Sequence, residues 1–229
     1  MNAPSLPRRA VAEFLGTAGL VAVVVGSGIA ASRLSPADVG LQLLQNSLAT
    51  ALGLAVLIVV LQPLSGAHLN PVVTLVNSRT VERAPGRTQA VYVAAQVGGG
   101  IVGTLAALAM FEEPFALSAA TRASVGTVFA EVVATAGLVG LIVVMARTGR
   151  AAWVGPAVGA YIGAAYWFTS STSFANPAVT IARVFTDSFA GIGPTSALWF
   201  VAAQVAGAVV GGFAAAWLVR RATSEPIRE

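Results

Sequence analysis

The chain contains uncharged apolar stretches that are too long for single membrane-spanning helices. Val39 to Ser78 carries no formal charge over 40 residues, and Ala151 to Ala182 and Ser188 to Val219 are also uncharged. A helix needs about 20 residues to cross the hydrocarbon core. The excess lies in Pro63–Asn77 and Thr169–Ala182. Backbone at membrane depth that is not a full helix must be buried in protein or line a cavity, so we expect two re-entrant segments.

The composition favours a multi-pass membrane protein. Hydrophobic residues make up 56% of the chain and charged residues 10%, whereas soluble domains carry about 25% charged residues. Six spans place both termini on one side of the membrane, and ten Arg on that side against three on the other assign both termini to the cytoplasm. We therefore expect an inner (plasma) membrane protein with a cytoplasmic tail at 220–229. The six expected spanning helices lie near 10–31, 42–62, 88–110, 125–146, 153–168 and 197–219.

Several function classes have no support in the sequence. The chain has no Cys and a single His, His68, so neither a thiolate site nor a cluster of His ligands for a metal can form. No pairing of a nucleophile with a base is visible, and we expect no enzyme activity and no cofactor. The net charge of +4 comes from Arg in short loops between apolar stretches. These Arg indicate membrane topology and no nucleic-acid partner.

The chain contains an internal repeat. We expect one channel domain, 1–229, built from repeat one at 10–110 and repeat two at 125–219. Each repeat holds three spans, an odd number, so the second copy is inverted, and such repeats place a site near the bilayer midplane. Three segments match in order, with offsets of 118, 106 and 108 residues: Ala12–Leu20 with Ala130–Leu138, Asn70–Leu75 with Asn176–Ile181, and Tyr92–Val97 with Phe200–Val205.

An Asn-Pro pair occurs at the same place in each repeat and predicts the start of a short helix. Asn70 and Asn176 are good N-cap residues, and Pro71 and Pro177 suit the first helical position. From Asn70 to Asn77 a helix would span about 12 Å, less than half of a core roughly 30 Å thick. Two half-helices entering from opposite faces would meet near the centre. Their positive N-terminal ends would repel cations, including protons.

Ser65–Thr74 and the second Asn-Pro pair resemble the major intrinsic proteins, the aquaporins and aquaglyceroporins. The resemblance extends over almost the whole chain. It implies an all-α membrane protein with six transmembrane helices plus two re-entrant half-helices, one pore per subunit, a homotetramer in membrane lipid, and passage of small neutral solutes. The residues that it implies for the central pore motif are Asn70, Pro71, Val72, Asn176, Pro177 and Ala178.

The resemblance also implies a constriction, with one departure from the family pattern. Most members carry an Arg directly after the second motif, where this chain has Val179. Arg183 lies four residues further on, and either reaches the outer mouth or pairs with Asp187 or lipid phosphate. At the site on the fifth span, two alternatives remain open, Ala164 without a gap or Tyr166 with one. The candidate constriction residues are Thr50, Ala164, Tyr166, Ser173, Val179 and Arg183.

The stretch Thr169–Arg183 is similar to a bacterial subgroup that is associated with arsenic resistance. This similarity implies passage of neutral arsenic acids, such as arsenous acid, as well as glycerol-like polyols. We therefore expect a passive channel for these solutes and for water that excludes protons and ions. Two alternatives are a water-selective aquaporin and a proton-coupled transporter. The carboxylates Glu13 and Glu131 would titrate in a transporter, or would instead hold the re-entrant loops. His68 either faces the pore or supports its loop.

Overall fold

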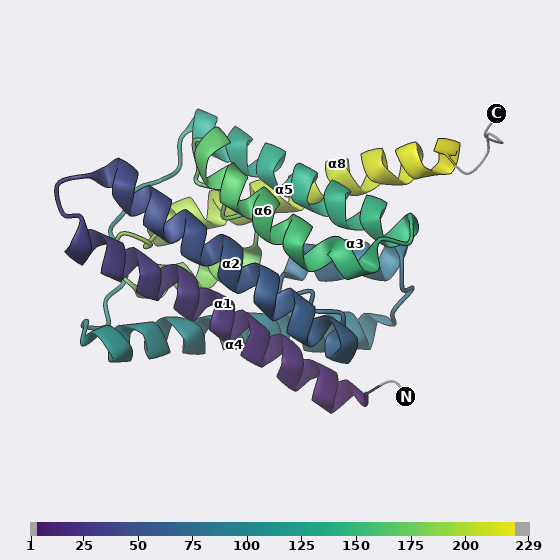
Figure 1. Cartoon of the computed structure of the whole chain (residues 1–229), viewed down its shortest axis with the longest axis horizontal. Helices are drawn as coiled ribbons and strands as arrows, with labels where there is room; N and C mark the ends of the chain where they lie inside the picture. Colours follow the sequence, from purple (N-terminus) through teal and green to yellow (C-terminus); the bar gives the residue numbers. More distant parts are fainter. Residues whose placement is uncertain (1–3, 223–229) are drawn as a thin grey trace.

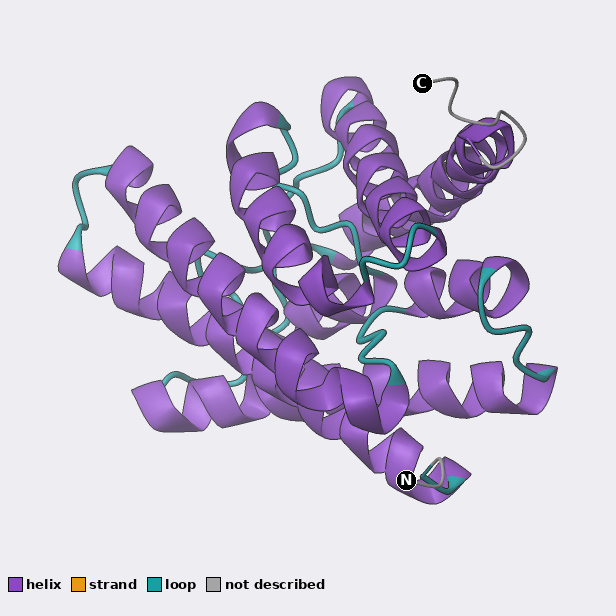
Figure 2. Ribbon diagram, turned by 45° about the vertical axis from the view of Figure 1, so that its right-hand side comes forward, coloured by secondary structure: helices purple, strands orange, loops and turns teal. Residues whose placement is uncertain are grey.

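The structure is a computed structural model that describes residues 4–222, and within this range it consists of helices and loops (Figures 1 and 2). The spanning helices pack around two short ones, and the start of α1 and the end of α8 lie at the same end of the bundle (Figure 1). The elements are α1 Leu6–Leu34, α2 Val39–Ser65, α3 Pro71–Thr80, α4 Gly86–Phe111, α5 Val125–Arg147, η1 Ala151–Trp153, α6 Val154–Phe168, α7 Pro177–Ala182, η2 Arg183–Phe185 and α8 Pro194–Ala222.

The expected fold class is confirmed, with small changes at helix ends. Among the described residues, α1, α2, α4, α5 and α8 are each long and apolar enough to cross a membrane. The remaining expected span is α6, which is 15 residues long and is preceded by the short helix η1. The expected tail at 220–229 begins inside α8, because that helix continues to Ala222. Residues 223–229 lie outside the described residues.

Local sequence signals explain where several helices begin and end. Asp38 caps α2 by accepting a hydrogen bond from the backbone N–H of Leu41 at 2.9 Å. Gly66 ends α2 in the left-handed conformation, with φ of 90°, which glycine adopts without steric cost. Ser124 and Thr127 form a capping box at the start of α5. The chain therefore leaves α2 in a sharp turn that leads directly into the first re-entrant segment.

Glycine allows the helices of each repeat to cross in close contact. A Cβ atom at Gly103 of α4 would lie 2.2 Å from the backbone oxygen of Ala18 in α1. A Cβ atom at Gly211 of α8 would lie 2.2 Å from the backbone oxygen of Ala136 in α5. The same crossing thus occurs at equivalent positions of both repeats. These pairs, α1 with α4 and α5 with α8, form the framework that holds the re-entrant segments.

Candidate functional site

The backbone of the two re-entrant segments alternates in conformation just before each Asn-Pro pair. Ala67 and Leu69 have φ of 48° and 49°, and their repeat equivalents Ser173 and Ala175 have φ of 50° and 47°. Left-handed conformations are costly for residues other than glycine and persist where the surroundings hold them in place. Alternation of this kind directs successive N–H groups to one side, where they can bind an anionic group.

A buried carboxylate accepts these N–H groups in each repeat. Glu13 of α1 accepts from the backbone N–H of His68 at 2.9 Å and of Leu69 at 2.7 Å. Its other donors are Ser65 Oγ at 2.6 Å and Gln96 Nε2 at 2.7 Å. The four hydrogen bonds bind the first loop to α1 and α4. Glu13 is fully buried and does not line the cavity described below.

The second repeat contains the same arrangement. Glu131 accepts from the backbone N–H groups of Phe174 and Ala175, both at 2.9 Å. Ser171 Oγ and Gln204 Nε2 donate to it at 2.6 Å each. Glu131 is also fully buried and away from the cavity wall. Of the two interpretations of these carboxylates, the contacts favour loop support.

The two Asn side chains face each other and connect the two re-entrant segments. The amide nitrogen of Asn70 donates to the backbone oxygen of Ala175 at 2.8 Å, and that of Asn176 donates to the backbone oxygen of Leu69 at 2.7 Å. Each Asn also caps its own helix, accepting from the N–H of Val72 in α3 and of Ala178 in α7. An amide carries two N–H donors, so each Asn keeps one donor for a ligand.

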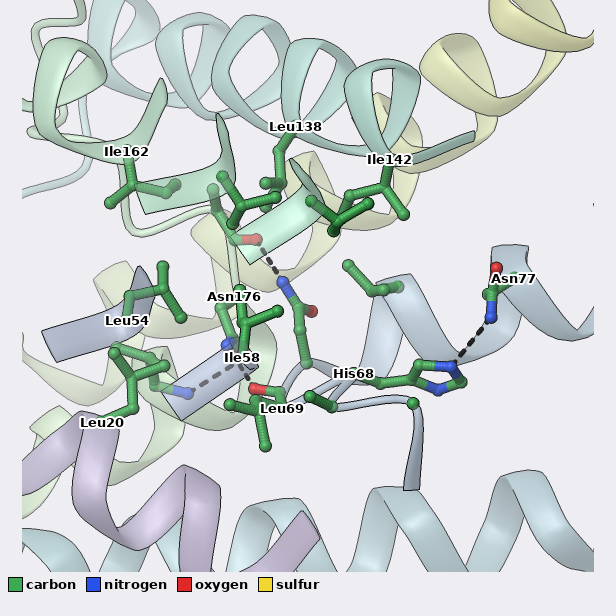
Figure 3. A pocket seen from close by; sticks show the side chains of 18 of the residues that line it. Leu20, Leu54, Ile58, His68, Leu69, Asn77, Leu138, Ile142, Ile162 and Asn176 are labelled. Atoms are coloured by element: carbon green, nitrogen blue, oxygen red, sulfur yellow. Dashed lines mark hydrogen bonds between the residues drawn. The ribbon is translucent and has the colours of Figure 1, made fainter. Parts of the chain in front are cut away.

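The side chains of Asn70 and Asn176 line a cavity of about 310 Å³. It would hold roughly ten water molecules at about 30 Å³ each. Figure 3 shows the apolar side chains of Leu138, Ile142 and Ile162 across the cavity from the loop that carries His68. Asn176 lies between the two sides. One wall is therefore apolar, while the opposite side combines the polar groups of the re-entrant loops with further apolar side chains, those of Leu20, Leu54 and Ile58.

Four of the candidate constriction residues line the cavity together with Arg183, and we call this part of the cavity the Arg183 end. The hydroxyl groups of Thr50 and Tyr166 are 3.2 Å apart and share a hydrogen bond between α2 and α6. Ser173 and Val179 also line the cavity. Ala164 is exposed on the outer surface of the bundle and does not line the cavity, so the alternative with Ala164 at the constriction is wrong. Its position on α6 faces outward, whereas Tyr166 is buried.

Arg183 reaches the cavity and does not pair with Asp187. The guanidinium is buried, lies 3.5 Å from the centroid of the Phe174 ring, and donates through Nε to the backbone oxygen of Ala190. Asp187 instead accepts from the backbone N–H of Ala119 at 3.1 Å. Of the two alternatives for Arg183, these contacts favour the one in which the side chain reaches the cavity. Sequence spacing alone could not decide this, because the side chain is placed by contacts with the loop after η2.

The opposite end of the cavity, which we call the His68 end, contains two residues that sequence reasoning did not select. His68 Nε2 lies 2.9 Å from the amide nitrogen of Asn77 and 3.7 Å from a carboxylate oxygen of Glu82 (Figure 3 shows the Asn77 contact). Its Nδ1 lies 3.2 Å from Thr74 Oγ1. The neighbouring His68 side chain lowers the pKa of Glu82. His68, Asn77 and Glu82 all line the cavity, so His68 both faces the cavity and supports its loop.

Comparison with known proteins establishes the family. The sequence model of the family described as major intrinsic protein matches residues 1–169 of this chain. The chain belongs to the major intrinsic protein family. Aquaglyceroporin AqpS of Rhizobium meliloti (strain 1021) is 49% identical over 220 residues, which are 95% of this chain and 92% of that protein. Aquaporin NIP1-3 of Oryza sativa subsp. japonica is 32% identical over 238 residues, covering 97% of this chain and 77% of that protein.

A solved structure agrees with the fold. The X-ray structure of the aquaglyceroporin from Plasmodium falciparum superposes with a TM-score of 0.71 and covers 96% of this chain and 98% of that one. At 23% identity it supports the fold alone. Membership of the major intrinsic protein family makes this chain a multi-pass membrane channel for small solutes, and not an enzyme. The cavity that contains both Asn side chains is the candidate solute pathway.

Proposed function

We propose that the chain is a passive channel for small uncharged solutes, namely glycerol-like polyols, neutral arsenic acids such as arsenous acid, and water. The observation that carries this proposal is the two-sided cavity, with Leu138, Ile142 and Ile162 on one wall and the donors of Asn70 and Asn176 on the other. A polyol has a carbon backbone that suits an apolar wall and hydroxyl groups that need donors and acceptors. Ligand sites of mixed polarity fix a solute in this way.

The Arg183 end supports passage of solutes larger than water. Val179 occupies the position at which the resemblance implies an Arg, and it brings no charge to the wall. Thr50 and Tyr166 offer hydroxyl groups that can exchange their mutual hydrogen bond for one with a solute. The relative from Rhizobium meliloti carries the name aquaglyceroporin, which agrees with a polyol pathway.

We include exclusion of ions and protons in the proposal. Asn70 and Asn176 cap α3 and α7 and line the cavity, so the positive N-terminal ends of both helices lie at the cavity wall. Oriented donors and positive helix ends of this kind form a barrier to protons and cations. We further propose a homotetramer in the inner membrane with both termini cytoplasmic, and a single channel domain of two inverted repeats.

A water-selective channel is the second candidate. One specific observation favours it, because Arg183 and the large side chain of Tyr166 both line the cavity, and bulky side chains at a constriction favour water over larger solutes. A proton-coupled transporter has less support. Its candidate carboxylates, Glu13 and Glu131, are surrounded by four donors each and lie off the cavity wall, so no titrating group meets the solute at those positions.

The test is stopped-flow light scattering on proteoliposomes, with water, glycerol and arsenous acid compared in the same preparation. Empty liposomes give the background rate for each solute. Fast flux of all three solutes supports the proposal. Fast water flux with glycerol and arsenous acid at the background rate would support the water-selective candidate and contradict the proposal.

A further inference from the structure

The guanidinium of Arg183 has unused hydrogen-bond donors. Its Nε donates to the backbone oxygen of Ala190, but within residues 4–222 neither terminal nitrogen has a hydrogen-bond partner. No carboxylate lies within ion-pair distance of Arg183 in the same range. The side chain is 3% exposed and lines the cavity, so these donors face the solute pathway. A buried cation without a charged partner is unfavourable and is stabilised by an anion that can reach it.

A second cation increases the positive field at this place. Arg122 lies 5.6 Å from the centroid of the Phe174 ring that Arg183 also contacts. Arg122 donates to the backbone oxygens of Gly191 at 2.5 Å and Phe189 at 2.6 Å. Burial lowers the pKa of Arg122, which is the effect expected of a cation taken out of water. Two guanidinium groups thus share one aromatic ring, and neither forms an ion pair within the described residues.

The charges along the cavity wall differ between its two ends. Among the described residues that line the cavity, the formally charged side chains are Arg183 at one end and Glu82 at the other. Glu82 adds a negative charge at that end, and the His68 side chain 3.7 Å away lowers the pKa of this carboxyl. An anion is therefore attracted to the Arg183 end and repelled from the His68 end. The apolar wall between the ends gives it no hydration.

We propose that the Arg183 end is a binding site for a tetrahedral oxyanion or a carboxylate, which blocks the pathway for neutral solutes while it is bound. Nη1 and Nη2 form a planar fork whose parallel N–H groups match two oxygens of such an anion. The anion occupies the constriction next to Tyr166 and Val179 and is held there. This inference rests on the proposed function, because a block requires a neutral solute that passes.

Inorganic sulfate is the probe. Glycerol flux into proteoliposomes is measured with sulfate on both sides, which makes the result independent of protein orientation. The reference buffer contains chloride at the same ionic strength, so that general screening is equal. We expect sulfate to slow glycerol flux at least twofold, with half-inhibition on the order of 1–10 mM, the range of a few charge-assisted hydrogen bonds.

Two variants and one control assign the block to Arg183. Arg183→Lys keeps the charge but loses the fork, and we expect it to need roughly tenfold more sulfate for the same inhibition. Arg183→Gln removes the charge and should abolish the inhibition. Arg33→Gln is the matched control, because Arg33 is exposed and pairs with Glu113 at 2.8 Å. Arg33→Gln should respond to sulfate as the unmodified chain does.

A binding measurement keeps the inference independent of flux. Sulfate should raise the thermal unfolding midpoint of the detergent-solubilised chain, and this effect should be weaker in Arg183→Lys. If 50 mM sulfate neither slows glycerol flux nor changes the thermal unfolding midpoint of the chain, the proposed site is overturned. Equal inhibition of Arg183→Lys and the unmodified chain would also overturn it. Absence of glycerol flux in chloride would contradict the proposed function instead, and the midpoint would then decide on the anion site alone.

Discussion

Replacing Glu131 with Gln tests whether the buried carboxylates hold the re-entrant loops. The carboxylate accepts four hydrogen bonds, from Ser171, Phe174, Ala175 and Gln204, at 2.6 to 2.9 Å. Gln can accept only at its single oxygen, so about two of the four donors would face an amide N–H₂ group. Hydrogen bonds to a charged acceptor contribute about 1.5–3 kcal/mol each. We therefore expect Glu131→Gln to destabilise the chain by roughly 3–6 kcal/mol.

The assay is thermal unfolding of the detergent-solubilised protein, followed by glycerol flux on the same preparation. For a chain of this size a loss of roughly 3–6 kcal/mol corresponds to a fall of the unfolding midpoint of roughly 6–24 °C. Glu113→Gln is the matched control. Glu113 forms an exposed ion pair with Arg33, and such pairs contribute about 0–1 kcal/mol, so its midpoint should move little. Flux should fall in Glu131→Gln because the second loop loses its anchor.

An equal midpoint for Glu131→Gln and Glu113→Gln would refute this reasoning. It would mean that the Glu131 carboxyl is protonated and donates one of the four bonds, an arrangement that Gln reproduces. The alternative in which Glu131 titrates in a proton-coupled transporter would then gain support.

Three further substitutions test the cavity wall and the helix crossings. Val179→Arg adds a cation at the constriction and should lower glycerol flux at least about tenfold while water flux remains. Stopped-flow light scattering measures both fluxes, and an equal loss of both would contradict this prediction. Tyr166→Phe removes the hydrogen bond to Thr50 and should raise the activation energy of glycerol flux, and an unchanged value would exclude a solute contact with that hydroxyl. Gly211→Ala should destabilise the chain by about 1–3 kcal/mol through overpacking, whereas Gly86→Ala, with no atom within 4 Å of its new Cβ, should not.

The short helices and their caps could be predicted from the sequence. An Asn followed by Pro encodes a helix start locally, and the structure contains α3 and α7 directly after Asn70 and Asn176. The apolar sequence is longer than its spanning helices need, and the surplus residues must lie at membrane depth. The chain was therefore expected to re-enter the membrane at these short helices. The length of the first short helix was less well determined. It was expected to reach Asn77 and continues to Thr80, because no Pro or Gly stops it before that residue.

The composition of the cavity ends depends on features that the sequence does not encode locally. Ala164 and Tyr166 lie on one helix, and only the rotation of α6 against α2 decides which of them faces the cavity. Glu82 meets His68 through a turn after α3, and a loop of this kind has no periodic pattern from which its path could be predicted. Arg183 is directed into the cavity by the Phe174 ring and the Ala190 carbonyl, which are tertiary contacts.

The most direct test of the central claim measures glycerol and proton movement in the same proteoliposomes. Light scattering reports glycerol uptake, and a pH-sensitive dye inside the vesicles reports protons, with a pH gradient imposed in half of the experiments. A passive channel for neutral solutes predicts fast glycerol uptake to equal concentrations, unaffected by the gradient, with proton leak equal to that of empty liposomes. Accumulation of glycerol above the outside concentration under a pH gradient, or no glycerol uptake above background, would contradict the account.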